Sequence, residues 1–187
     1  MRSVTRCSET LNLIALALWA GALIGAGGAA AVLFPTLKQL APTLPDFAAF
    51  PDDHWKIAGG LVGVRLFVLA DVVQLGAACA TILALIVTRL AGGTQASRAA
   101  TGLRLVFMAF AWLLASYQIM VLGPRMQTNL NAFYAAAKAG QVDVARVNRD
   151  AFDADHPTAS RVLGGTLLAV MGALAASAWG LSARKEP

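Results

Sequence analysis

Charged residues are scarce in this 187-residue chain: 13% of its residues are Asp, Glu, Lys or Arg, whereas 58% are hydrophobic. A soluble domain usually has about 25% charged residues, so this composition is too apolar for one. The chain also lacks the apolar and polar alternation that a membrane barrel strand needs. Because lipid cannot satisfy irregular backbone or open sheet edges, these absences predict an all-α membrane protein.

Several chemical motifs are missing as well. The sequence has no phosphate loop, no dinucleotide fingerprint and no Gly-x-Ser-x-Gly elbow. Its two cysteines, Cys7 and Cys79, form no Cys-x-x-Cys motif. The formal net charge is +5, but no basic cluster interleaved with aromatic residues accompanies it. These absences argue against nucleic acid as a partner and favour a non-enzymatic function.

Four apolar stretches are long enough to cross a membrane, which takes about 20 residues per helix. We expect one membrane domain, a four-helix bundle, with spans at about residues 11–34, 59–89, 104–123 and 161–183. Arg2 and Arg6 before the first stretch are typical of a signal peptide. The apolar run continues to Phe34, however, which is too long for a signal core, so we expect a retained helix.

The distribution of basic residues predicts the orientation. With four spans, both termini lie on the same side as the short connection between the second and third spans. These segments hold few acidic residues, only Glu9 and Glu186, beside seven cations: Arg2, Arg6, Arg89, Arg98, Arg104, Arg184 and Lys185. The two long connections hold a similar number of cations but also seven aspartates. By the positive-inside rule, both termini are cytoplasmic and the two long connections face outward, which in a bacterium means the inner membrane.

The two long connections have different patterns. Residues 35–56 contain four prolines, so we expect an extended strap that Phe47, Phe50 and Trp55 hold against the membrane surface. The other connection predicts an amphipathic helical cap between the third and fourth spans, with Gly140 as a C-cap and a second short helix from about Asp143. Its apolar residues recur at helical spacing: Met126, Leu130, Phe133, Tyr134 and Ala137.

Polar side chains that enter the membrane gather at the outer ends of the spans. Arg65, Arg125 and Arg161 each stand at such an end, and Asp71 and Gln74 lie deeper on one face of the second span. The functional interpretation is a pocket that binds an anionic lipid headgroup, carboxylate or porphyrin propionate. The structural interpretation is that the arginines snorkel to lipid phosphates and Asp71 forms an interhelical pair.

A metal site is a second hypothesis. His54 precedes the second span and His156 precedes the fourth, while Met120 and Met126 flank the end of the third. Imidazole and thioether groups ligate copper, and two imidazoles can ligate a haem iron. The residues show no fixed ligand spacing, and a lone histidine beside Asp and Pro more often caps a helix.

The chain resembles the transmembrane protein 205-like family, known in bacteria as domain of unknown function 4149. The resemblance covers about residues 11–180 and rests on short motifs: Trp19 with Gly21, Leu33-Phe34-Pro35, Gly59-Gly60-Leu61-Val62-Gly63, Gly123-Pro124-Arg125-Met126, and His156 with Ser160. It implies a four-helix membrane protein and brings no established reaction. The proline-rich connection before His54 departs from the family pattern.

These patterns leave three hypotheses about function. The first is an accessory membrane protein that holds a ligand, a lipid or a metal at the outer pocket. The second is a haem- or copper-binding oxidoreductase or a subunit of one. The third is a structural subunit of a larger membrane complex, whose glycine-rich helix faces contact other membrane subunits.

Overall fold

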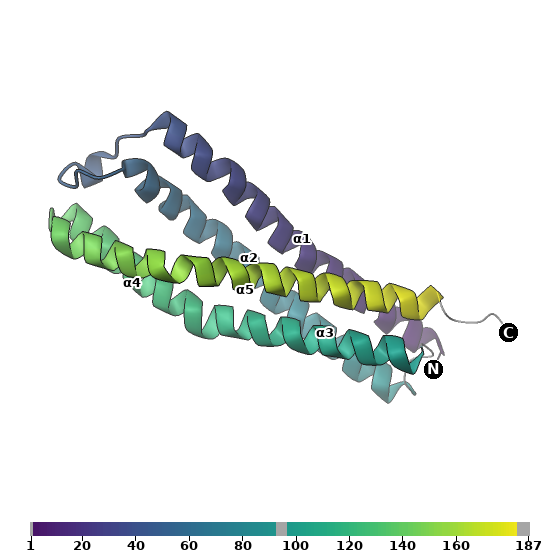
Figure 1. Ribbon diagram of the computed structural model, residues 1–187. Helices are drawn as coiled ribbons and strands as arrows, with labels where there is room; N and C mark the ends of the chain where they lie inside the picture. The colour runs from purple at the N-terminus through teal and green to yellow at the C-terminus, as the bar shows by residue number, and fades with distance from the viewer. Residues whose placement is uncertain (1, 93–96, 183–187) are drawn as a thin grey trace. The chain divides into compact units, whose positions relative to one another are not determined.

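The computed structural model describes residues 2–92 and 97–182, and the described part is helical with no β-strand (Figure 1). This confirms the all-α prediction. Ala183, Arg184 and Lys185, which entered the predictions of span and orientation, lie outside the described residues. The elements are α1 (Arg2–Leu40), the 3-10 turn η1 (Pro45–Phe47), α2 (His54–Leu90), α3 (Arg98–Tyr117), the π-helical turn η2 (Gln118–Leu122), α4 (Gly123–Lys138) and α5 (Val142–Ser182).

Four helical segments are long and apolar enough to cross a membrane, as the sequence predicts. They are Ser3–Leu40, His54–Leu90, Arg98–Lys138 and Val142–Gly180. Each is considerably longer than the roughly 20 residues that a bilayer core requires. The chain is therefore a multi-pass membrane protein whose helices extend past their apolar stretches.

The chain divides into two compact units. The first, here called the bundle unit, comprises residues 1–24, 70–115 and 163–187. Segments of α1, α2, α3 and α5 pack in it as four helices around buried Leu16, Trp19, Met108 and Val170. On α2, alanines alternate with polar residues along the buried face: Ala70, Gln74, Ala77, Thr81, Ala84 and Thr88. The bundle core is thus tightly packed and partly polar.

The second unit, here called the strap unit, comprises residues 25–69 and 116–162. Its core joins Phe47, Phe50 and Ile57 to Leu130 and Phe133, and the rings of Phe50 and Phe133 meet edge-on at 5.5 Å. The prediction that Phe47 and Phe50 lie against the membrane surface is wrong, because they are only 3% and 2% exposed within the protein. The strap is folded onto its own helices.

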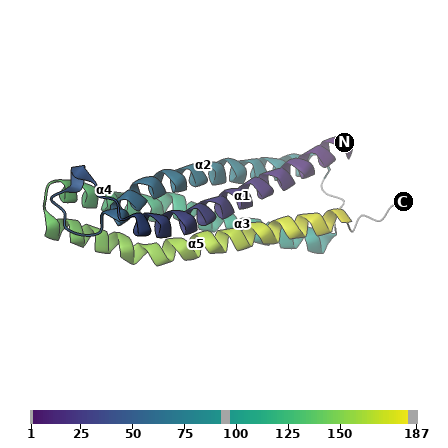
Figure 2. The same cartoon turned by 90° about the horizontal axis from the view of Figure 1, so that it is seen from above.

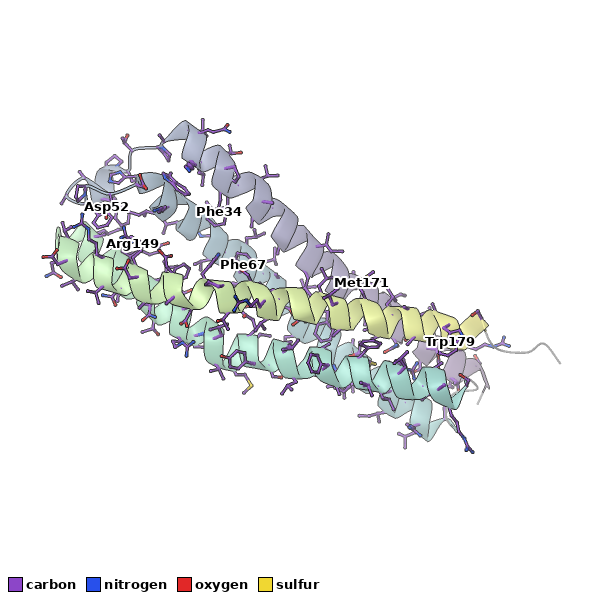
Figure 3. All side chains as sticks on the ribbon, viewed as in Figure 1. Phe34, Asp52, Phe67, Arg149, Met171 and Trp179 are labelled. Carbon is purple, nitrogen blue, oxygen red and sulfur yellow. The ribbon has the colours of Figure 1, made fainter. Side chains whose placement is uncertain are left out.

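The strap is also shorter than predicted. Pro35 lies inside α1, which continues to Leu40, so only residues 41–53 connect α1 to α2. Proline removes one backbone donor from a helix but does not always end it. A Cβ atom added to Gly59 would lie only 2.8 Å from the ring of Phe34, which is labelled in Figure 3. Gly59 therefore permits close packing of α1 and α2.

A π-helical turn joins α3 to α4, so residues 98–138 form one helical path (Figure 1). The N–H of Gly123 bonds the carbonyl of Gln118, five residues back. A Cβ on Gly123 would lie 2.9 Å from that carbonyl oxygen, so only glycine fits. Pro124, which has no N–H, follows directly. The Gly-Pro pair thus explains the change of helical register.

The predicted helical cap is present but continuous with the spans. Helix α4 ends in a Schellman motif, in which Gln141 N–H bonds Ala136 O at 2.9 Å and Gly140 adopts φ +69°. Gly140 therefore terminates the helix directly after the C-cap residue Ala139, close to the predicted C-cap. The helix that begins at Val142 is not short, because it runs through Pro157 to Ser182 as α5 (Figure 2).

Candidate functional site

The strap unit contains five arginines, and three of them are bound to aspartates. Arg125 on α4 forms two hydrogen bonds with Asp155 on α5, from Nε to Oδ2 at 2.7 Å and from Nη2 to Oδ1 at 2.5 Å. Such forked geometry is the strongest form of this ion pair. Asp155 is 18% exposed and Arg125 51%, and Tyr117 is a second, weaker partner of the guanidinium.

Arg146 and Arg149, one turn apart on α5, hold Asp52 of the strap. Arg146 donates to both carboxylate oxygens at 3.2 and 3.0 Å, and Arg149 donates at 2.8 Å. Figure 3 shows Asp52 and Arg149 side by side. Hydrogen bonds and charge from the two arginines hold the pKa of Asp52 below its ordinary value of 3.8, against a smaller opposing effect of burial.

His54, one of the predicted metal ligands, fastens the same strap. Its Nδ1 accepts a hydrogen bond from the Leu44 N–H at 2.9 Å, and its Nε2 lies 2.9 Å from the carbonyl of Phe50. The ring therefore carries its proton on Nε2 and donates it to Phe50. With both nitrogens used by the backbone, this histidine has a structural role in the strap.

The remaining predicted metal ligands do not converge in one place. His156 is exposed and its ring lies tilted beside that of Phe152, with the ring centres 5.8 Å apart, and Met120 is 75% exposed. Met126 is buried against Leu122 and Ala159. Among the described residues, no three His, Cys, Asp or Glu side chains gather in a way that would hold a metal ion. Copper or haem binding remains a prediction without a structural cluster to support it.

Asp71 and Gln74 belong to a hydrogen-bonded chain in the bundle unit. The Nε1 of Trp19 donates to Gln74 Oε1 at 3.1 Å, and Gln74 Nε2 donates to Asp71 Oδ1 at 2.9 Å. Gln74 is fully buried. The interhelical ion pair expected for Asp71 is not observed within the described residues. The carboxylate of Asp71 instead accepts a hydrogen bond from Gln74, whose side chain is held by the buried indole of Trp19.

The other two predicted residues, Arg65 on α2 and Arg161 on α5, are both exposed. Neither has a hydrogen bond, ion pair or ring contact within the part of the chain that the structure describes. Every other Lys or Arg of the strap unit has one: Lys38 over Trp55, Lys56 with Asp53, Lys138 with Asp46, Arg125 with Asp155, and Arg146 and Arg149 with Asp52. Arg65 and Arg161 are the two uncommitted cations of this unit.

Sequence reasoning missed a buried ion pair in the bundle unit. Glu9 on α1 and Arg104 on α3 approach to 3.6 Å, and their side chains are only 5% and 6% exposed. The signal was present, since Thr5, Ser8, Glu9 and Asn12 recur at helical spacing, and all are buried. Ser8 also bonds the carbonyl of Ala84 at 2.6 Å. These residues form a polar end to the buried face of α1.

The fold and these groups define the class: a multi-pass helical membrane protein with a buried polar pair in one unit and an ion-paired strap in the other. Comparisons with protein-family models, with curated proteins and with solved structures give no match to this chain. Its resemblance to the transmembrane protein 205-like family therefore stays a prediction from short motifs, and its function has to be argued from its own residues.

Proposed function

We propose that this chain is an accessory, non-enzymatic membrane protein that binds the phosphate of an anionic lipid headgroup through Arg65 and Arg161. The observation that carries the proposal is that these two arginines have no partner within the described residues, whereas the other cations of the strap unit are all engaged. A guanidinium group binds phosphate oxygens in a forked geometry.

The position of both residues along the chain supports a lipid. Arg65 immediately precedes the apolar stretch 66–88, and Arg161 immediately precedes the apolar stretch 162–183. An arginine at the end of an apolar stretch lies at headgroup depth, where lipid phosphates are concentrated. Both termini then lie in the cytoplasm and the strap lies outside, in accordance with the distribution of Lys and Arg.

Arg125 supplies a secondary contact in this proposal. Its Nε and Nη2 atoms bind Asp155 and Tyr117 is a further partner, so only the remaining exposed part of the guanidinium can contact a phosphate. Because Asp155 neutralises most of its charge, we expect Arg125 to contribute less than Arg65 or Arg161. Asp71 and Gln74, which are bonded to each other, take no part in binding.

Native mass spectrometry of the detergent-purified protein tests the proposal. We expect phosphatidylglycerol to remain bound to the wild type and to be lost, with affinity lowered at least about tenfold, from the Arg65→Gln/Arg161→Gln variant. The matched control is Arg89→Gln/Arg98→Gln, which removes two exposed arginines from the bundle unit. Inorganic phosphate added in place of the lipid distinguishes a free anion from a headgroup. Equal lipid retention by all three proteins would refute the proposal.

A further inference from the structure

Helix α5 has an exposed apolar face on the part that precedes its membrane span. Four exposed residues form it: Val144, Val147, Ala151 and Ala154. The two valines are 51% and 69% exposed. The spacing of three and four residues matches the a and d positions of two heptads, the pattern by which one helix packs along another. The opposite side of the segment is already used, because Ala145 and Phe152 pack in the core of the strap unit.

Lipid tails do not cover this apolar face. Residues 142–155 contain four aspartates and two arginines around the rest of the helix, and charged side chains are costly to place in hydrocarbon. The apolar stretch of α5 begins at residue 162, so Val144 lies about 27 Å before it along the helix, at about 1.5 Å per residue. The headgroup layer is only about 5–8 Å thick in each leaflet. The apolar face is therefore exposed to water.

Helix α4, in the same unit, has a different exposed surface. Its exposed residues include Thr128, Asn131 and Lys138, which are all polar. Single exposed apolar residues are common on protein surfaces, but a regular a and d series outside the membrane is typical of a surface that another helix covers. Because α5 is already a helix, its backbone loses little conformational entropy when a second helix packs against it.

The residues that flank the apolar face carry negative charge. In the heptad pattern the flanking e and g positions are Asp143, Asn148, Asp150 and Asp155. Asp143 is exposed, and the side chain of Asp150 is 71% exposed. The arginines of the same segment neutralise them only in part, because Arg146 and Arg149 both bind Asp52, and Arg149 lies closer to Asp52, at 2.8 Å, than to Asp150, at 3.4 Å. The apolar face thus has acidic borders.

We propose that the exposed apolar face of α5 binds a helix of another protein outside the membrane, one with apolar residues at its a and d positions and Lys or Arg at its e and g positions. Opposite charges at e and g stabilise a helix pair, and like charges oppose it. A second copy of this chain is disfavoured, because its acidic borders would face those of the first. The surface includes neither Arg65 nor Arg161, so it does not depend on the lipid-binding proposal.

Binding of synthetic peptides to the full chain in phosphatidylcholine nanodiscs tests the proposal. The basic peptide has about three heptads with Leu at a and d and Lys at e and g, and the acidic peptide has Glu in place of Lys. Fluorescence anisotropy measures both affinities, and empty nanodiscs give the contribution of lipid. Val147→Glu places a charge in the apolar face, and Asn131→Glu, at an exposed position of α4, is its matched control. Asp150→Asn removes one acidic border, and Asp153→Asn, an exposed aspartate at neither an e nor a g position, is its control.

We expect the basic peptide to bind to the wild type and to both controls, with affinity lowered at least about tenfold in Val147→Glu and about threefold in Asp150→Asn. The acidic peptide should not bind. The proposal is overturned if the basic peptide binds no better than it does to empty nanodiscs, if the acidic peptide binds equally well, or if Val147→Glu binds as the wild type does. Native mass spectrometry of the protein alone covers the remaining occupant, since a dimer that Val147→Glu dissociates would assign the surface to a second copy and also overturn the proposal.

Discussion

The two units use the same chemistry, carboxylate with guanidinium, in opposite environments. Glu9 and Arg104 in the bundle unit are almost completely buried, whereas the side chains of Asp52 and Arg146 in the strap unit are 26% and 45% exposed. Desolvation makes a buried charge expensive as soon as its partner is removed, while water replaces the partner of an exposed one. We therefore expect the buried pair to determine whether the protein folds, and the exposed pairs to determine whether the strap stays in place.

The largest effect should come from breaking the buried pair. Arg104→Ala leaves the Glu9 carboxylate in the bundle without its cation, and we expect a loss of about 3–5 kcal/mol of stability. Reversible unfolding in mixed micelles, followed by circular dichroism, measures it. Arg98→Ala, at an exposed position of the same helix, is the control. A loss below about 1 kcal/mol would mean that the pair is hydrated and the comparison with exposed pairs is wrong.

A smaller loss is expected at Gln74. Gln74→Leu deprives the buried Trp19 Nε1–H of its acceptor and should cost about 1–3 kcal/mol. The double variant Trp19→Phe/Gln74→Leu removes donor and acceptor together, so it should lose less than the sum of the two single changes. The same unfolding assay provides all three values, and strict additivity would show that the hydrogen bond contributes nothing.

The strap should respond locally. Asp52→Asn removes the charge that Arg146 and Arg149 hold, so we expect faster proteolysis within residues 41–53 with a global stability change of at most about 1 kcal/mol. Asp53→Asn is the matched control, because Asp53 is exposed and its only ion pair among the described residues is with Lys56 at 3.4 Å. Equal cleavage of the two variants would show that the arginines do not hold the strap.

Acid should release the same strap in the wild type. Because the pKa of Asp52 is lowered in the folded protein, its contribution is complete above the ordinary value of 3.8 and disappears as the pH falls through the lowered pKa. Pepsin, which is active in acid and cuts beside phenylalanine, reports the exposure of Phe47 and Phe50. We expect cleavage to rise below about pH 3.8 in the wild type. In Asp52→Asn it should be high and change little with pH, and a rise matching the wild type would contradict this assignment.

The smallest effect is expected at Arg125. Arg125→Lys keeps a positive charge but cannot form the two-pronged contact with Asp155, and because the arginine side chain is 51% exposed we expect the smallest change in stability of the series. The unfolding assay measures it. A change as large as that of Arg104→Ala would show that exposure does not determine how much these ion pairs stabilise the protein.

The number and approximate place of the spans were predictable because the apolar length that crosses a bilayer is fixed by its thickness. The ends of the helices were not, because Pro35 was taken as a break and the helix from about Asp143 was taken as short. Pro35 and Pro157 both lie inside helices, and the hydroxyl of Thr36 bonds the carbonyl of Val32 at 2.8 Å just beside the first. Local side-chain bonds of this kind do not show in an apolar pattern.

The candidate site was predictable as a set of residues but not as a set of pairs. The positions of Arg65, Arg125 and Arg161 follow from the ends of apolar stretches, whereas the choice of Asp155 as the partner of Arg125 depends on how α4 and α5 are rotated about their axes. Glu9 and Arg104 were taken as flanking charges. They are buried because α1 begins at Arg2 and α3 at Arg98, which places both inside helices and on packed faces.

The central claim is that Arg65 and Arg161 bind lipid phosphate, and solid-state NMR of the protein in phosphatidylglycerol bilayers tests it most directly. With arginine Cζ labelled with ¹³C, dipolar coupling to ³¹P reports guanidinium groups in contact with phosphate. We predict strong dephasing of signals that vanish in Arg65→Gln and Arg161→Gln, and weak dephasing of the Arg125 signal. Dephasing that is absent, or that is unchanged in both variants, would contradict the proposal.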